Sequence, residues 1–133
     1  MIIFDTSAII DFLKGGVKTR SIVEEIESNR ESVYTTVISQ YELLTPVYHK
    51  GMKGEERNIR AFLRRSIVFP LDQNSAEEAS RIMGSLFKLG LPINALDTLI
   101  AGIAIETGTD KIATLDRDFI QIAKVTDLDV III

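Results

Sequence analysis

The chain has 133 residues, of which 46% are hydrophobic and 26% charged, with a net charge of −4 and no cysteine. This size and composition predict one globular domain, residues 1–133, built around a single core. The lack of cysteine excludes disulfides, thiolate catalysis and cysteine-based zinc sites, and it fits a cytoplasmic protein. The negative charge argues against nucleic-acid binding through bulk charge alone, although carboxylates that hold metal ions also contribute to it.

Short β-like runs alternate with helical patterns along the chain. The first half is expected to contain a strand at 2–4, helices at 6–13 and 19–29, a strand at 32–37, and helices at 39–50 and 54–65. The second half is expected to contain a strand at 67–71, helices at 75–89 and 94–107, a strand at 111–115, a helix at 117–124 and a strand at 130–133. This alternation predicts parallel pairing with right-handed crossovers, and therefore an α/β fold arranged as a three-layer sandwich.

Two apolar segments bear on localisation. No basic residue precedes the apolar start of the chain, so a secretory signal is not expected. The longest nearly apolar stretch, residues 91–105, is shorter than the roughly 20 residues of a membrane-spanning helix. It also contains Asp97, so it predicts a buried core helix and no association with a membrane.

Asp97 is the only charged residue between positions 91 and 105. A carboxylate in a buried helix is costly unless it is paired, hydrogen-bonded or bound to a metal. Alternatively, Asn94 caps the helix and Asp97, three residues later, stabilises the helix N-terminus. The local sequence supports both explanations equally.

Glu42 has a structural explanation of the same kind. Ser39 and Glu42 have the spacing of a capping box, in which each side chain bonds the other residue's backbone amide. Ser75 and Glu78 have the same spacing, and no chemistry is assigned to them. Taken alone, Glu42 is therefore interpreted as a structural residue.

Three further aspartates follow expected strands. Asp5 comes directly after the strand at 2–4, where it either caps the next helix or serves as a ligand at the mouth of the sheet. Asp116 and Asp118 follow the strand at 111–115. One of them is expected to cap the short helix and the other to face the site. Asp116 is favoured as the site residue because it lies closer to the strand.

Several carboxylates that converge repel one another unless a cation is present. Their hard oxygen atoms select Mg²⁺ or Mn²⁺, and such an ion can activate water against a phosphodiester. The number of ions, one or two, stays open. Other chemistries fit poorly, because the single histidine, His49, has no second histidine for a zinc site and no serine has an adjacent base.

A segment rich in lysine and arginine, residues 50–65, lies between Glu42 and Asp97 in the sequence. Arg57, Arg60 and Arg64 fall on one face if this segment is helical. The face is either simply solvated or a stripe that follows phosphates or binds a partner.

The acidic motifs together resemble PIN-domain ribonucleases, in particular the VapC-type toxins of prokaryotic toxin–antitoxin pairs. Four segments carry the resemblance in order along nearly the whole chain: the opening strand and Asp5 (residues 2–8), the segment with Glu42 (38–43), the segment with Asp97 (94–101), and the closing motif with Asp116 and Asp118 (114–119). Each motif is weak alone. In this order and in a chain of this size, the set is specific.

The resemblance implies a PIN-like fold with a parallel five-stranded sheet in the order 3-2-1-4-5. It implies a Mg²⁺- or Mn²⁺-dependent endoribonuclease, a hydrolase in which Asp5, Glu42 and Asp97 bind an ion. Asp116 would bind a second ion or orient water, with Asp118 as the other candidate for this role.

The family's other properties concern supporting residues and partners. Thr6 and Thr114 match positions that support the site through hydrogen bonds. The resemblance further implies a homodimer and inhibition by a small cognate antitoxin of a type II system. Two other functions remain: a PIN-fold module that binds protein or RNA without catalysis, and a structure-specific DNA nuclease.

Overall fold

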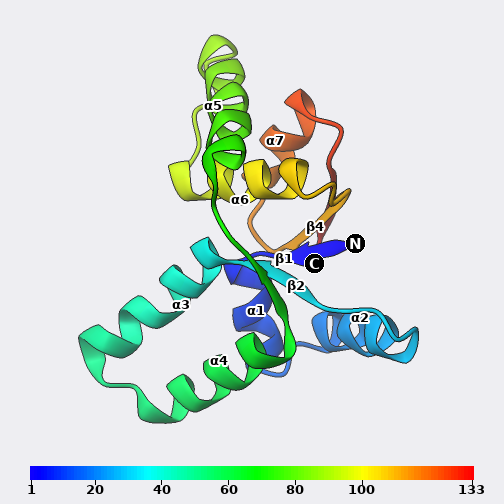
Figure 1. Cartoon of the computed structure of the whole chain (residues 1–133), viewed down its shortest axis with the longest axis vertical. Coiled ribbons are helices and arrows are strands. Elements are labelled where there is room, and N and C mark those ends of the chain that lie inside the picture. Colours follow the sequence, from blue (N-terminus) through cyan, green and yellow to red (C-terminus); the bar gives the residue numbers. More distant parts are fainter.

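The computed structural model describes residues 1–133, and its five strands form one sheet (Figure 1). The strands are β1 (Ile2–Phe4), β2 (Tyr34–Thr36), β3 (Ile67–Phe69), β4 (Lys111–Thr114) and β5 (Asp129–Ile132). All neighbouring strands pair in parallel, in the order β3-β2-β1-β4-β5. The expected fold class and strand order are therefore confirmed.

Seven helices connect and flank these strands. They are α1 (Thr6–Leu13), α2 (Val17–Ser28), α3 (Val37–Lys50), α4 (Lys53–Arg65), α5 (Gln73–Lys88), α6 (Ala95–Glu106) and α7 (Phe119–Val125). Every element expected from the sequence is present, and no boundary moves by more than two residues. Helix ends are the least defined part of any such assignment.

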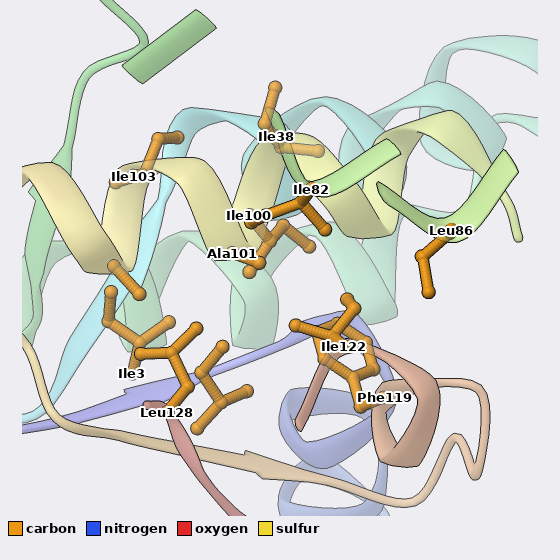
Figure 2. Packing of buried hydrophobic residues seen from close by; sticks show 12 residues of the cluster. Ile3, Ile38, Ile82, Leu86, Ile100, Ala101, Ile103, Phe119, Ile122 and Leu128 are labelled. Carbon is orange, nitrogen blue, oxygen red and sulfur yellow. The ribbon is translucent and has the colours of Figure 1, made fainter. Parts of the chain in front are cut away.

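The helices cover both faces of the sheet, because successive side chains of a strand point in opposite directions. Ile3 packs in a cluster with residues of α5, α6 and α7, among them Leu86, Ile100 and Phe119 (Figure 2). Phe4, the next residue, packs in a second cluster with residues of α1 to α4. Figure 1 shows the two groups of helices on opposite sides of the sheet, which gives the expected three layers.

Two helices begin at residues other than the expected caps. Thr36 caps α3, and its hydroxyl accepts a hydrogen bond from the amide of Ser39 at 3.3 Å. Asp72 caps α5 in the same way, accepting from the amide of Ser75 at 2.8 Å. The capping boxes expected at Ser39 and Ser75 are therefore wrong, and Glu42 has no capping role.

The apolar stretch with Asp97 forms a core helix, as expected. Seven residues of α6 are buried, including Asp97 itself. None of the helices has the length and apolar character needed to cross a membrane.

Candidate metal site

The candidate site lies where β1 and β4 end beside each other. Phe4 of β1 is in register with Ala113 of β4, so Asp5 and Thr114 follow at the same edge of the sheet. The chain runs outward from β1 in one direction to β2 and β3, and in the other to β4 and β5. This reversal of strand order is the position at which open α/β sheets bind ligands.

Asp5 is buried and serves both the fold and the site. One carboxylate oxygen, Oδ1, accepts hydrogen bonds from the amide of Ala8 at 2.9 Å and the hydroxyl of Ser7 at 2.7 Å. The other, Oδ2, accepts from the hydroxyl of Thr114 at 2.5 Å. Burial raises the pKa of Asp5, although these three hydrogen bonds oppose the shift. Asp5 thus caps α1, which is one of the two roles expected from the sequence. It also lies at the mouth of the sheet, which is the position expected for the other role.

Asp97 is the third residue of α6, and Asn94 caps that helix by accepting from the amide of Leu96 at 2.9 Å. The expected cap is therefore confirmed. The carboxylate of Asp97 nevertheless lies among other acids. Burial, followed by the charges of Asp116, Asp5 and Glu42, raises the pKa of Asp97 to about 7.

Asp116 and Asp118 complete a close acidic group with Asp97. One carboxylate oxygen from each of the three residues lies within 4.8 Å of the others. The Thr114 hydroxyl accepts from the amide of Asp116 at 2.9 Å, and Asp116 Oδ1 accepts from the amide of Asp118 at 2.9 Å. Asp118 precedes α7 without a capping hydrogen bond from its side chain. The structure thus brings both candidates for the fourth acid to Asp97, rather than only one.

Glu42 reaches the same region from α3. Its Oε1 accepts a hydrogen bond from the hydroxyl of Thr6 at 2.7 Å, and that hydroxyl also lies 3.1 Å from the hydroxyl of Ser39. Glu42 contributes to the raised pKa of Asp97, so the two carboxylates lie within each other's electrostatic field. All five predicted site residues therefore converge at one edge of the sheet.

A family model provides the identification. The model for the PIN domain matches residues 2–125. The chain belongs to the PIN-domain family. This PIN domain also resembles solved toxin–antitoxin structures over nearly its whole length.

Three solved structures illustrate that resemblance. The VapBC2 complex of Rickettsia felis bound to a promoter DNA fragment has a TM-score of 0.84 at 20% identity, covering 98% of this chain and 97% of that one. VapBC-1 of nontypeable Haemophilus influenzae has a TM-score of 0.80 at 23% identity, covering 99% and 98%. VapC20 of Mycobacterium tuberculosis, described as a toxin that cleaves the sarcin-ricin loop, has a TM-score of 0.67 at 14% identity, covering 96% and 98%.

These comparisons confirm the PIN-domain family and the resemblance in fold to VapC-type toxins. No sequence among the curated proteins matches the chain significantly.

The donor set of this PIN domain fits a hard divalent cation. Every side chain of the cluster offers carboxylate oxygen, which Mg²⁺ and Mn²⁺ prefer, and no histidine or cysteine contributes. The raised pKa values of Asp5 and Asp97 report repulsion and lost hydration, both of which a bound cation would offset. His49 is exposed in the last turn of α3 and belongs to a different part of the molecule.

Ser7 is a site residue that the sequence did not reveal. Its hydroxyl donates to Asp5 at 2.7 Å, accepts from the amide of Leu115 at 2.9 Å and lies 3.2 Å from the hydroxyl of Thr114. Ser7 therefore ties the segment that carries Asp116 to the end of β1. The only feature of the sequence that pointed to Ser7 was its position two residues after Asp5. A serine at that position is equally typical of the start of a helix.

Proposed function

We propose that this PIN domain is a metal-dependent endoribonuclease that hydrolyses RNA phosphodiester bonds. The observation that carries the proposal is the convergence of the carboxylates of Asp97, Asp116 and Asp118, with Asp5 and Glu42 beside them. Residues 1–133 would act as one nuclease domain.

The acidic residues would hold Mg²⁺ or Mn²⁺, with Asp5, Glu42 and Asp97 as ligands and Asp116 and Asp118 completing the set. When bound, the ion supplies a polarised phosphodiester oxygen and a water of lowered pKa. The protein's own part is to orient the ligands. Thr6 fixes one oxygen of Glu42, while Thr114 and Ser7 fix Asp5. Asp97, with a pKa of about 7, would release its proton as the ion binds.

The neighbours of the fold support a proposal for the biological role. Several of them are toxin–antitoxin complexes, and one is described as a toxin that cleaves the sarcin-ricin loop. We therefore propose that the chain is a cytoplasmic toxin of a type II system, forms a homodimer and is inhibited by a cognate antitoxin.

The deciding experiment is an RNA cleavage assay on protein freed from any antitoxin. Wild-type protein should cut RNA with Mn²⁺ and lose this activity with EDTA. Asp97→Asn should reduce the rate at least 100-fold, because it removes a charged ligand. Asp129→Asn serves as the matched control, since Asp129 is an exposed carboxylate at the opposite end of β5. Equal cleavage by Asp97→Asn and wild type would show that the assigned site is wrong.

One observation favours a second function. Asp5 caps α1 and Asp97 lies in the first turn of α6, so both acids occupy helix N-terminal positions that can be explained without any metal. A PIN-fold module that binds RNA or protein without catalysis would retain them for that reason. It would bind its partner equally well with Mn²⁺ or EDTA and would cut nothing.

A further inference from the structure

The outer face of α3 carries two exposed tyrosines beside the candidate site. Tyr41 is 62% exposed and Tyr48 is 78% exposed, although large aromatic side chains usually bury most of their surface. The two residues are seven positions apart, so two helical turns place them on one face. Tyr41 directly precedes Glu42, which links this face to the acidic site.

The neighbouring helix α4 adds an arginine face to these tyrosines. The Nη2 of Arg60 donates to the Tyr48 hydroxyl at 3.2 Å, while its Nε pairs with Glu56 at 2.7 Å. Arg57 and Arg64 share this face of α4 by their spacing; both are exposed and neither forms a salt bridge. The Arg60–Tyr48 contact joins the two helices into one surface, and Figure 1 shows α3 and α4 as adjacent helices on one side of the sheet.

Charge is unevenly distributed between this surface and the rest of the chain. Helix α4 contains five basic residues and two acidic ones, whereas the whole chain has a net charge of −4. The last turn of α3 adds Lys50. A local basic surface in an acidic protein favours a polyanion at that place.

We propose that the outer faces of α3 and α4 bind single-stranded RNA: bases stack on Tyr41 and Tyr48, and Arg57, Arg60 and Arg64 neutralise phosphates. The inference rests on the proposed function and names the form of its substrate. Stacking on aromatic side chains with arginines along the backbone is how proteins hold single strands.

Stacking on the two tyrosines favours a single strand over a duplex. Seven residues of helix separate the two side chains by about 10 Å along the axis. Neighbouring bases of a duplex strand are about 3.4 Å apart and stacked on each other. Duplex bases therefore present no free face to either tyrosine, whereas a single strand can place one base on each. A protein partner fits these outer faces less well, because Tyr41 and Tyr48 are the only large apolar residues exposed on them. The apolar groove of this region, which includes Leu43 and Val47, lies instead between α3, α1 and α4.

The test measures binding of a labelled 12-nucleotide RNA of mixed sequence, with Ca²⁺ in place of Mn²⁺ so that binding is separated from cleavage. The double variant Tyr41→Ser/Tyr48→Ser should weaken binding at least tenfold, because base stacking is lost. Tyr41→Phe/Tyr48→Phe should bind within twofold of wild type, because phenylalanine also stacks. Arg57→Gln/Arg64→Gln should weaken binding and lower the slope of log K against log salt by about 1.4.

The matched controls lie on α5. Phe87→Ser removes another aromatic residue that is 63% exposed, and Arg81→Gln removes another exposed arginine. Both should bind RNA like wild type, and all variants should melt like wild type. Unchanged affinity in both double variants, or duplex DNA bound as tightly as the RNA, would overturn the proposal.

Failure of this inference is distinguishable from failure of the proposed function. If wild type cleaves RNA with Mn²⁺ but the tyrosine and arginine variants bind RNA like wild type, only the proposed binding surface is refuted. RNA binding that depends on these residues in a protein that never cleaves would refute only the nuclease.

Discussion

Asp97 carries the strongest electrostatic signal of any residue in the chain. Its pKa rises from the ordinary value of 3.8 to about 7, mainly through burial and then through three neighbouring carboxylates. Between these two pH values the folded state holds a proton that the unfolded chain has released. The metal-free protein is therefore stabilised by this proton at low pH, and the contribution disappears as pH rises through 7.

The sign of this effect leads to a stability prediction. In metal-free buffer, Asp97→Asn should match wild type near pH 4 and exceed its free energy of unfolding by about 1–2 kcal/mol at pH 8. This figure is well below the value that the full shift would give, because water screens a carboxylate at the mouth of a site. Urea unfolding at the two pH values measures it. A variant less stable than wild type at pH 8 would contradict the electrostatic origin of the shift.

Thr6 should control the position of Glu42. Thr6→Val keeps the shape of the side chain but removes the hydroxyl that donates to Glu42 at 2.7 Å. Metal affinity or cleavage rate should fall 10–100-fold, as is usual when a residue that orients a ligand is lost. Thr6→Ser restores a hydroxyl and should recover most of the activity. If Thr6→Val and Thr6→Ser behave alike, the hydrogen bond is irrelevant to the site.

The sequence supported each acidic residue to a different degree. It identified Asp97 on physical grounds, because a lone carboxylate in a buried helix needs a partner. It could not separate capping from ligation for Asp5, and the structure shows why: the same carboxylate meets the helix amide and the edge of the sheet. The choice between Asp116 and Asp118, and the role of Ser7, depend on how a loop folds back across β1 and β4, which no local spacing encodes.

At the scale of elements, the backbones of α5 and α6 approach each other closely at Gly102. A Cβ placed on Gly102 of α6 would lie 2.4 Å from the carbonyl oxygen of Ser75 and 2.8 Å from the amide nitrogen of Ala79, both in α5. These are backbone atoms, so the two helices would have to separate. Gly102 therefore sets the distance at which α6, with Asp97, packs against α5.

Gly102→Ala should destabilise the protein by about 1–3 kcal/mol, the usual cost of overpacking. Gly84→Ala is the matched control, because Gly84 lies within α5 and a Cβ there would meet nothing within 4 Å. That variant should gain about 0.5–1 kcal/mol through helix propensity. Chemical denaturation of both variants measures the difference. Equal effects of the two substitutions would mean that α5 and α6 do not pack as closely as described.

The expected elements are all present, yet two helix caps were placed three residues too late. Thr36 and Ser39, like Asp72 and Ser75, are pairs of possible caps at capping-box spacing. In each pair the later serine is buried and lies inside the helix. Tertiary packing therefore selects the earlier cap, and local sequence offers both equally.

At the scale of the whole molecule, the parallel sheet creates the site. The α/β rhythm predicted parallel strands, and parallel strands bring the residues after β1 and β4 to one edge. The order of the strands could not be predicted in this way, because periodicity does not say which strands are neighbours. That order was predicted from the family resemblance. Residues separated by more than a hundred positions, such as Asp5 and Thr114, meet only through that order.

A bound metal should stabilise the whole fold. With a dissociation constant in the micromolar range, Mn²⁺ at 100 times that constant adds about 2.7 kcal/mol to the free energy of unfolding. The melting temperature should rise with Mn²⁺ and return to its original value with EDTA. Asp97→Asn should show a much smaller rise. A similar rise in that variant would place the metal elsewhere.

The most direct test of the acidic cluster is a calorimetric titration with Mn²⁺ at pH 8, where Asp97 is largely ionised in the free protein. Wild type and the control Asp129→Asn should bind with micromolar affinity, and Asp5→Asn should lose that binding. Wild type that binds no better than millimolar, or Asp5→Asn that binds like wild type, would contradict a metal site formed by these carboxylates.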